Sequence, residues 1–366
     1  MSSYAGPAAI TDGLVFEYDM GNTQKSWKGA PITNLLTGTG TTNLGNGVFL
    51  SGGGTRTDLG NGKYRFDVTV ARTFRMYCNL ATLTNGQTYG CSLKFEENSC
   101  SFLSLDWCDT AVAGGVNSGA GITSGRLYGT ATRGTYDATY RFLDINLGIG
   151  SVILSEAQVD SIPISTPYVN GTRSNTQAIV DLTGNNTVTA NSLTYASDET
   201  FSFNGSADQI SIPSINFSNE QTIEMWLQPL ENDGSRRNPY NKAYGGYGTW
   251  THETNGTINH FFGNAGANTS PYVASNSAFT VAQNEIACVC TTRNISCAWW
   301  YKNGIQYNSL VNPYGVLNTD NNSILIGNGY AGRYLGNIFA IRLYNRALSS
   351  AEISGNFNAY RGRFGI

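Results

Sequence analysis

Hydrophobic and polar residues alternate with a period of two along many short segments of this chain, a pattern that predicts β-strands. Gly, Asn, Asp and Ser separate the segments, as expected of turns. Lys302-Asn303-Gly304-Ile305 places Asn-Gly between two such segments, which predicts a tight β-hairpin. The predicted strands are 13–19, 63–70, 88–95, 140–147, 200–203, 209–212, 222–227, 285–292, 298–302, 323–326 and 338–344.

A helical pattern occurs at the C-terminal end. Ser349-Ser350-Ala351-Glu352 has the spacing of a capping box, in which Ser349 and Glu352 each satisfy a backbone amide of the first turn. Ile353 and Phe357 follow on one helical face, and Gly362 is expected to end the helix. The fold class predicted is all-β, with two antiparallel β-sandwich (jelly-roll) domains and one short C-terminal helix.

Composition narrows the class of protein further. Only 13% of the 366 residues are charged, 12% are aromatic and 43 are glycine, whereas an average soluble domain has about 25% charged residues. The aromatic content excludes a disordered chain, and the net charge of -3 without a basic run argues against a nucleic-acid partner. No apolar stretch is long enough for membrane insertion, and the first ten residues do not resemble a signal peptide.

The number of cysteines and histidines does not indicate a disulfide framework or a histidine-dependent catalytic site. An odd count of seven cysteines in a chain of this length is not a disulfide framework, and buried free thiols are expected. The chain has two histidines, which weakens any mechanism that depends on histidine.

Two regions differ in composition, and the join lies near Pro163 and Pro167. Residues 37–165 hold four cysteines and long Gly/Thr/Ser tracts, whereas residues from 166 onward are rich in Asn and contain most of the tryptophans. Two prolines cannot continue a central sheet, so the segment that contains them is expected to be a domain border.

Several motifs in the second region resemble the laminin-G / concanavalin-A-like sandwich modules common in bacteriophage structural proteins. They are the closing segment 326–357, FNGSADQI at 203–210, TIEMWLQP at 222–229, WYKNG at 300–304, and the tail at 356–366. Residues 33–36 and 155–173 resemble the start and end of carbohydrate-binding jelly-roll modules of phage tail proteins.

The resemblance also implies an unusual chain path. The opening strand at 13–19 is normally followed closely by a turn such as DLTGN, which occurs here only at 181–185. We therefore expect a jelly roll at 37–165 inserted into a concanavalin-A/laminin-G-like sandwich of residues 1–36 plus 166–366, since insertion is inexpensive where the guest's ends lie together. The alternative is two sequential domains, 1–165 and 166–366.

The same fold family includes glucanases, whose catalytic carboxylates have a characteristic spacing. Their pattern is Glu-x-Asp-x-x-Glu, and here Glu17 and Asp19 are followed by Asn22 in the place of the acid/base. An amide cannot donate and recover a proton, so no catalytic residue is assigned and the protein is expected not to be an enzyme.

An aromatic stretch at 238–252 favours binding instead. Aromatic faces can stack on sugar rings while polar neighbours bond to hydroxyls. The candidate glycan-binding residues are Tyr240, Tyr244, Tyr247, Trp250 and His252. The alternative is that these side chains pack over the end of the sandwich or against another subunit.

No metal site and no cofactor are assigned. Members of the resembled family often bind calcium through loop carboxylates, and the turn residues that could serve are dispersed: Asp181, Asp208, Asp233 and Asp320.

The resemblance implies a structural protein of a phage particle: a fibre, a capsid decoration or a tail-attached adhesion protein. It would fold in the host cytoplasm without a signal peptide and be displayed at the virion surface. Expected partners are other virion proteins, further copies in a homo-oligomer such as a trimer, and host surface glycans. Two alternatives stay open: a glycan-processing hydrolase on a concanavalin-like fold, and a purely structural virion protein without a ligand.

Overall fold

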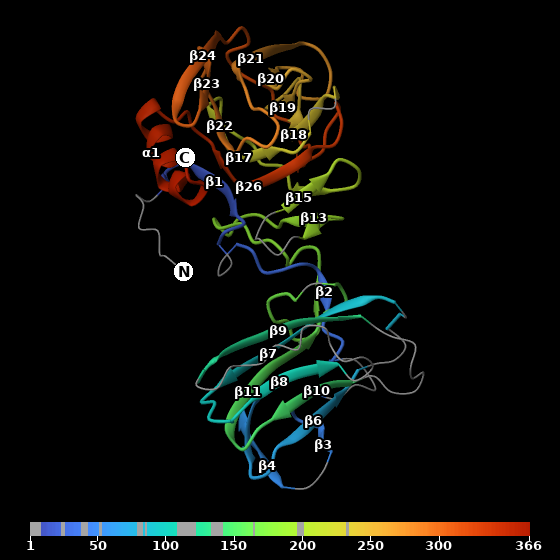
Figure 1. Ribbon diagram of the computed structural model, residues 1–366. Coiled ribbons are helices and arrows are strands. Elements are labelled where there is room, and N and C mark those ends of the chain that lie inside the picture. Colours follow the sequence, from blue (N-terminus) through green and yellow to red (C-terminus); the bar gives the residue numbers. More distant parts are fainter. Residues whose placement is uncertain are drawn as a thin grey trace. The chain divides into compact units, whose positions relative to one another are not determined.

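The computed structural model describes residues 9–22, 26–37, 43–50, 53–78, 83–84, 86–107, 122–132, 142–163, 165–195, 201–231 and 234–366. The chain divides into two compact units (Figure 1). Unit 1 comprises Met1–Lys28 and Asn175–Ile366, and unit 2 comprises Gly29–Ser174. Two sequential domains, 1–165 and 166–366, do not correspond to this division, because β1 (Leu14–Asp19) pairs with β26 (Leu335–Tyr344).

Unit 1 is built from two antiparallel sheets. The first has the order β14-β15-β26-β17-β22-β23-β24, with β1 also paired to β26. Its remaining strands are β14 (Thr194–Tyr195), β15 (Phe201–Asn204), β17 (Gln221–Pro229), β22 (Ala287–Arg293), β23 (Cys297–Lys302) and β24 (Ile305–Val311). The second has the order β13-β16-β25-β18-β19-β20-β21. Its strands are β13 (Thr189–Asn191), β16 (Gln209–Ile212), β18 (Arg237–Ala243), β19 (Gly248–His252), β20 (Thr257–Gly263), β21 (Tyr272–Thr280) and β25 (Ile324–Ile326).

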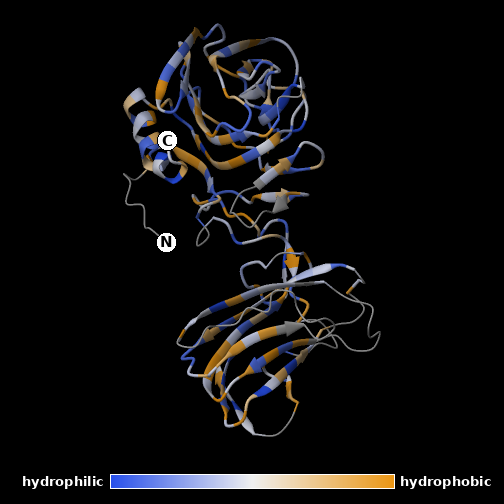
Figure 2. Ribbon diagram, in the orientation of Figure 1, coloured by the Kyte–Doolittle hydropathy of each residue, from blue (hydrophilic) through white to orange (hydrophobic). Residues whose placement is uncertain are grey.

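The core of unit 1 lies between these sheets. Trp250 of the second sheet and Trp300 of the first are fully buried, with ring centroids 5.6 Å apart. The strands show the expected alternation of apolar and polar residues in Figure 2. β17 and β22 are buried along nearly their whole length, because a helix covers part of the outer face of the first sheet.

That helix is α1 (Ser350–Phe364), the only helix in the described part of the chain. The predicted capping box is confirmed: Ser349 is the N-cap, and Ser349 and Glu352 bond reciprocally. The predicted end at Gly362 is wrong, because the left-handed C-cap is Gly365, with φ 70°. Phe357 and Phe364 stack on Trp226, with centroid distances of 5.6 and 4.5 Å.

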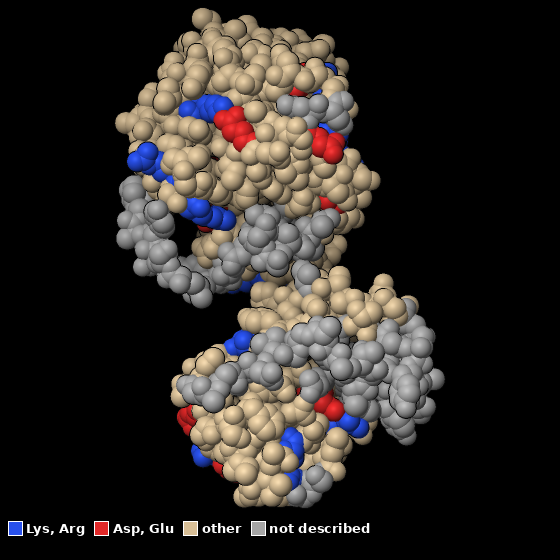
Figure 3. All heavy atoms as spheres, in the orientation of Figure 1, with Lys and Arg blue, Asp and Glu red and all other residues tan. Residues whose placement is uncertain are grey.

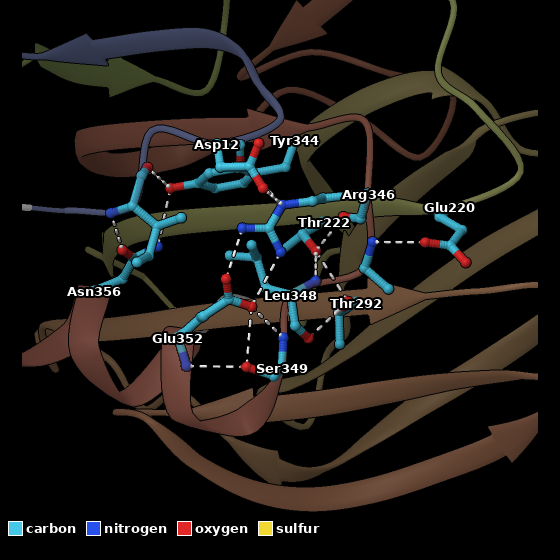
Figure 4. A network of polar contacts seen from close by, with 12 residues as sticks. Asp12, Glu220, Thr222, Thr292, Tyr344, Arg346, Leu348, Ser349, Glu352 and Asn356 are labelled. Carbon is cyan, nitrogen blue, oxygen red and sulfur yellow. Dashed lines mark hydrogen bonds and ion pairs between the residues drawn. The ribbon is translucent and has the colours of Figure 1, made fainter.

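A polar network fixes α1 and the N-terminal segment to the first sheet (Figure 4). Arg346 forms ion pairs with Glu352 (2.6 Å) and Asp12 (3.0 Å). Asn356 of α1 accepts a hydrogen bond from the Ile10 amide and donates one to the Tyr344 hydroxyl. Two of these contacts, from Asn356 to Ile10 and from Arg346 to Asp12, join residues more than 330 positions apart in sequence.

Unit 2 is a second antiparallel sandwich. One sheet has the order β3-β6-β10-β8, and the other has the order β4-β5-β11-β7-β9. The strands are β3 (Val48–Phe49), β4 (Gly54–Gly60), β5 (Lys63–Val68), β6 (Arg72–Tyr77), β7 (Thr88–Glu96), β8 (Leu103–Trp107), β9 (Gly125–Thr132), β10 (Phe142–Leu147) and β11 (Gly150–Val159). Their inward residues form one continuous core cluster that includes Phe66, Phe74, Leu93 and Leu154.

The N-terminal and C-terminal ends of unit 2 lie next to each other. β2 (Ile32–Thr33) pairs with β12 (Thr172–Arg173), so the first and last strands of the unit are antiparallel neighbours. In unit 1, Trp27 and Ile179 form an isolated antiparallel bridge just outside those limits. The two ends of the intervening segment therefore lie close together, as an inserted module requires.

The structure confirms the predicted all-β class with a C-terminal helix. The Asn303-Gly304 hairpin joins β23 to β24, with φ of 51° and 77° at its two central residues, the signs of a type I′ turn. Six of the seven cysteines lie in the described part of the chain, and all six are free thiols, five of them buried. The seventh, Cys108, lies outside the described residues.

Candidate functional site

The structure buries four of the five candidate glycan-binding residues. Tyr240 and Trp250 have no exposed surface, Tyr247 is 2% exposed and His252 is 3% exposed. Only Tyr244 is partly exposed. A ring without an exposed face cannot stack on a ligand, so this set contributes Tyr244 alone to the surface.

The burial follows from the strand geometry. Tyr240 of β18 is opposite Trp250 of β19, and both point into the core, where Trp250 donates a hydrogen bond to Thr291 of the other sheet. The Tyr247 hydroxyl donates to the Phe217 carbonyl at 2.7 Å. Burial raises the pKa of Tyr240 and lowers that of His252, whose ring bonds to the Val281 carbonyl. These side chains are structural elements of the sandwich.

A different set of rings forms a cluster on the outer face of the second sheet. We call Tyr244, Phe261, Tyr272 and Tyr330 the aromatic platform. Tyr244 contacts Tyr272 and Tyr330 with centroid distances of 5.2 and 5.1 Å, and Phe261 contacts the same two rings at 6.0 Å each. The four rings thus close into a cycle. Tyr272 and Tyr330 are 44% and 46% exposed.

Strand alternation places Phe261 on this outer face. Its neighbours His260 and Phe262 are buried, and His260 contacts Trp300 of the opposite sheet, so both face the core. Phe261 therefore points the other way. Tyr272 starts β21 on the adjacent edge, opposite Gly263 of β20.

A loop after β25 brings Tyr330 to the platform. The buried Asn238 side chain accepts a hydrogen bond from the Ala331 amide at 2.6 Å and donates to the Trp250 carbonyl. At Gly329 a Cβ would lie 2.6 Å from Asn238 Cγ, so this close approach requires glycine. The Tyr330 hydroxyl lies 3.3 Å from Thr251 Oγ1. Loop and sheet together hold the ring in place.

A row of polar side chains borders the platform. We call Arg236, Glu253, Asn259 and Asn276 the polar row. Arg236 and Glu253 form two hydrogen bonds of 2.7 and 3.0 Å, and the Arg236 guanidinium lies 5.8 Å from the centre of the Phe261 ring. Asn259 donates to Glu253 at 3.0 Å, and Asn276 donates to Asn259 at 2.9 Å. The bond to Glu253 raises the pKa of Arg236.

Charged residues are few on the face of the molecule that Figure 3 draws, and most of that face is uncharged. In the polar row the one cation and the one anion pair with each other. Such a surface offers aromatic faces, amides and hydroxyls, the groups that recognise uncharged polar ligands.

Three platform residues and all four residues of the polar row were missed by the sequence prediction. Phe261 could have been found from the alternation in β20, where two buried neighbours imply an outward residue. Tyr272 is the first residue of β21 and Tyr330 lies in the turn after β25, and no local pattern links them to Tyr244. Their proximity is a consequence of the tertiary fold.

The carboxylates considered for catalysis are held in ion pairs. Glu17 pairs with Arg342 at 2.7 Å, and Asp19 pairs with Arg363 at 2.5 Å. Arg342 also pairs with Glu224 at 2.6 Å, and its guanidinium lies 4.1 Å from the centre of the Tyr360 ring of α1. The side chains of Glu17 and Glu224 are only 14% and 1% exposed.

The turn aspartates considered for calcium bond to the protein itself. Asp181 accepts from the amides of Glu17 and Thr183, and Asp320 pairs with the buried Lys242 at 3.2 Å. Asp208 accepts from the Asn204 amide, and Asp233 lies outside the described residues. Over the described ranges, no three His, Cys, Asp or Glu side chains are grouped to hold a metal ion. The helix α1 lacks the length and apolar character needed to cross a membrane, and the described residues contain no other helix.

Comparison with solved structures returns matches of low sequence identity. The binding domain of Paraclostridial Mosquitocidal Protein 1 is 19% identical over 50% of this chain and 49% of its own, with a TM-score of 0.42. The botulinum neurotoxin serotype D ligand binding domain in complex with N-acetylneuraminic acid is 17% identical, with the same coverage and TM-score. Domain 4 of AbnA, a GH43 extracellular arabinanase from Geobacillus stearothermophilus solved with arabinotriose, is 18% identical over 50% of this chain and 91% of its own, with a TM-score of 0.38.

The chain thus spans about half the length of the toxin domains that it matches. No curated protein sequence matches it. A family model described as the concanavalin A-like lectin/glucanases superfamily matches residues 204–354, which run from the end of β15 into α1. Residues 204–354, the larger part of unit 1, are therefore similar to the concanavalin A-like lectin/glucanases superfamily.

Proposed function

We propose that this chain is a non-catalytic, cofactor-independent glycan-binding protein and that the aromatic platform of unit 1 contacts the sugar. The observation that carries the proposal is the closed cycle of four rings, two of them nearly half exposed, on a sheet face next to the polar row. Clusters of exposed aromatic side chains are typical of binding sites, because covering their apolar surface with a ligand removes it from water and is favourable.

The charge pattern favours a neutral glycan. Arg236 and Glu253 neutralise each other, and the remaining members of the polar row are amides. Amides donate and accept hydrogen bonds, which suits a sugar that carries hydroxyls and no net charge. An acidic glycan would need a cation that is not already paired.

The test uses the full chain on an array of neutral and acidic glycans, followed by titration calorimetry with the strongest neutral hit. Tyr272→Ala and Tyr330→Ala should each weaken binding by about fivefold to thirtyfold, since a central aromatic contact contributes about 1–2 kcal/mol. Thermal unfolding should change little, because both rings are half exposed.

Tyr307→Ala is the matched control. Tyr307 is 51% exposed and lies on β24 of the other sheet, so it removes a tyrosine of equal exposure away from the platform. Equal affinity of the wild type and both platform variants for every glycan on the array would overturn the proposal.

The proposal of binding without hydrolysis is supported by the paired carboxylates. A retaining glycosidase needs two carboxyl groups about 5 Å apart and open to substrate. Here Glu17 and Glu224 share Arg342 and are covered by α1, and Asn22 follows where an acid/base would stand. Release of reducing ends from a glycan that the protein binds, abolished by Glu17→Gln, would favour the hydrolase alternative.

We also propose the setting in which the protein acts, the surface of a phage particle. The support is the resemblance of residues 326–366 to the closing segments of phage structural proteins. Other virion proteins and further copies of the chain would then be its partners. Mass spectrometry of purified particles tests this, since hundreds of copies would indicate capsid decoration and tens a tail or fibre protein. Absence of the chain from particles would refute the setting and leave the glycan proposal standing.

A further inference from the structure

A small cavity lies in unit 2, and the residues that line it belong to that unit and not to the aromatic platform. Its volume is about 200 Å³, and its walls include Tyr64, Tyr168, Asn43, Asn170, Glu156 and Leu44. This is smaller than the roughly 300–1,000 Å³ of pockets for drug-sized ligands. It suits a ligand of about a dozen heavy atoms.

One buried side chain, Asn34, ties together three segments that line the cavity. Its Nδ2 donates to the carbonyls of Ala157 and Val169, both at 3.2 Å. Its Oδ1 accepts from the amides of Leu36 and Val159, at 3.1 and 3.2 Å. Two donors and two acceptor sites are thus all used, and Asn34 is 1% exposed. The walls are therefore held in fixed positions relative to one another.

The strand β11 departs from regular geometry where it reaches the cavity. Its register with β7 shifts between Ser155 and Gln158, and Glu156 adopts a left-handed φ of 52°. Arg126 bonds to the Glu156 carbonyl at 3.3 Å and also pairs with its carboxylate. A bulge redirects a side chain, and a non-glycine residue in this conformation is strained. The redirected residue is a wall of the cavity.

Several polar groups in the cavity wall have no partner within the described part of the chain. They are the hydroxyls of Tyr64 and Tyr168 and the side-chain amide of Asn170, which form no hydrogen bond with other described residues. Tyr168 is 36% exposed, and burial together with the nearby Glu156 raises its pKa. Donors and acceptors that converge on a cavity are bonded by water until a ligand replaces it.

We propose that this cavity binds a single neutral sugar ring, such as the terminal residue of a glycan. Tyr64 and Tyr168 would supply apolar ring faces and hydroxyl groups, and Asn170 would bond to sugar hydroxyls. Arg126 and Lys94, which lies 3.8 Å from Glu156, compensate the Glu156 carboxylate, so the ligand need not be a cation. The site is a second glycan site in a separate unit and does not depend on the aromatic platform.

The experiment titrates the full chain with methyl glycosides of glucose, galactose, mannose and N-acetylglucosamine, and follows binding by saturation-transfer NMR and calorimetry. At least one glycoside should bind in the millimolar range. Tyr168→Ala and Asn170→Ala should each weaken that binding by about fivefold or more, because each removes one wall contact.

Two controls separate this site from the platform. Tyr128→Ala removes a tyrosine that is 50% exposed on β9 of the same unit, and it should leave glycoside binding unchanged. The platform variant Tyr272→Ala should also leave it unchanged, while Tyr168→Ala should not alter binding at the platform. If none of the four glycosides binds, or if Tyr168→Ala binds as the wild type does, the cavity proposal is overturned whatever the platform binds.

Discussion

Trp250 and Trp300 each donate a hydrogen bond across the core of unit 1, to the sheet that contains the other tryptophan. Trp250 lies in the second sheet and donates from its indole N–H to Thr291 of the first sheet, at 3.2 Å. Trp300 lies in the first sheet and donates to Ser275 of the second, at 2.9 Å. The two rings are in contact, with centroids 5.6 Å apart. Each sheet is thus bonded to the other through the largest side chains of the core.

Trp300→Ala should therefore destabilise unit 1 strongly. Truncating a buried tryptophan typically costs about 3–5 kcal/mol, and here the Ser275 hydroxyl also loses its partner. Urea unfolding followed by circular dichroism measures the loss. Trp299→Phe is the control, because Trp299 is only partly buried and packs on the other side of the same strand. Equal losses in both variants would contradict the assigned role.

Arg342 should stabilise the fold strongly because it pairs with two acidic residues, the buried Glu224 and the partly buried Glu17. Arg342→Met leaves both carboxylates without this counter-charge, and breaking a buried pair in this way costs about 3–5 kcal/mol. Adding Glu224→Gln to Arg342→Met should recover part of that loss. The unfolding free energies of wild type, single and double variants test this, and no recovery in the double variant would show that packing dominates.

The free energy of unfolding should decrease as the pH is lowered, because His260 binds a proton more readily in the unfolded chain than in the folded one. Burial, with a smaller effect of Arg293, lowers the pKa of His260 to about 3. An unfolded histidine titrates near pH 6.5, so below that value the unfolded state binds more protons than the folded state. The stabilisation is complete above about pH 6.5 and is lost progressively as the pH falls toward about 3.

The variant His260→Phe isolates this effect, because phenylalanine fills a similar space between Phe262 and Trp300 and does not titrate. Between about pH 6 and pH 4, the slope of unfolding free energy against pH should be smaller in the variant by up to about 1.4 kcal/mol per pH unit. Parallel curves for the two proteins would mean that His260 is not the group responsible.

The capping box of α1 should contribute measurably to the packing of Trp226. Ser349→Ala removes the side chain that accepts from the Glu352 amide, at a cost of about 1 kcal/mol. Because Phe357 and Phe364 of α1 stack on Trp226, fraying should also shift tryptophan fluorescence to the red. Ser354→Ala, in the middle of the helix, should cause neither change.

The strands and helix were predictable because their patterns are local. The alternation in residues 209–212 gives β16 with its predicted bounds, and the capping spacing at Ser349 locates the start of α1. Helix ends are less certain, since both Gly362 and Gly365 could adopt the left-handed conformation that a C-cap needs. The tertiary packing of Phe364 on Trp226 extends the helix past Gly362.

The platform was not predictable from local patterns. Residues 238–252 are rich in aromatic side chains, and composition cannot distinguish those that point into a sandwich from those that point out. The register places Tyr240 opposite Trp250, so both lie on the same face of the sheet, which is the face toward the core. Tyr244 lies beyond the end of β18 and contacts Tyr330, which belongs to a loop 86 positions later. Register and loop path are properties of the whole fold.

The pairing of β2 with β12 has a consequence for how this protein can vary. Since the entry and exit strands of unit 2 lie next to each other, the whole unit can be lengthened, replaced or removed without altering the distance that unit 1 must span between Lys28 and Asn175. Exchange of the segment between Lys28 and Asn175 for another domain whose ends are adjacent should therefore preserve the fold of unit 1. A single recombination event at these two positions would replace unit 2, while the two-sheet core around Trp250 and Trp300 remains as it is.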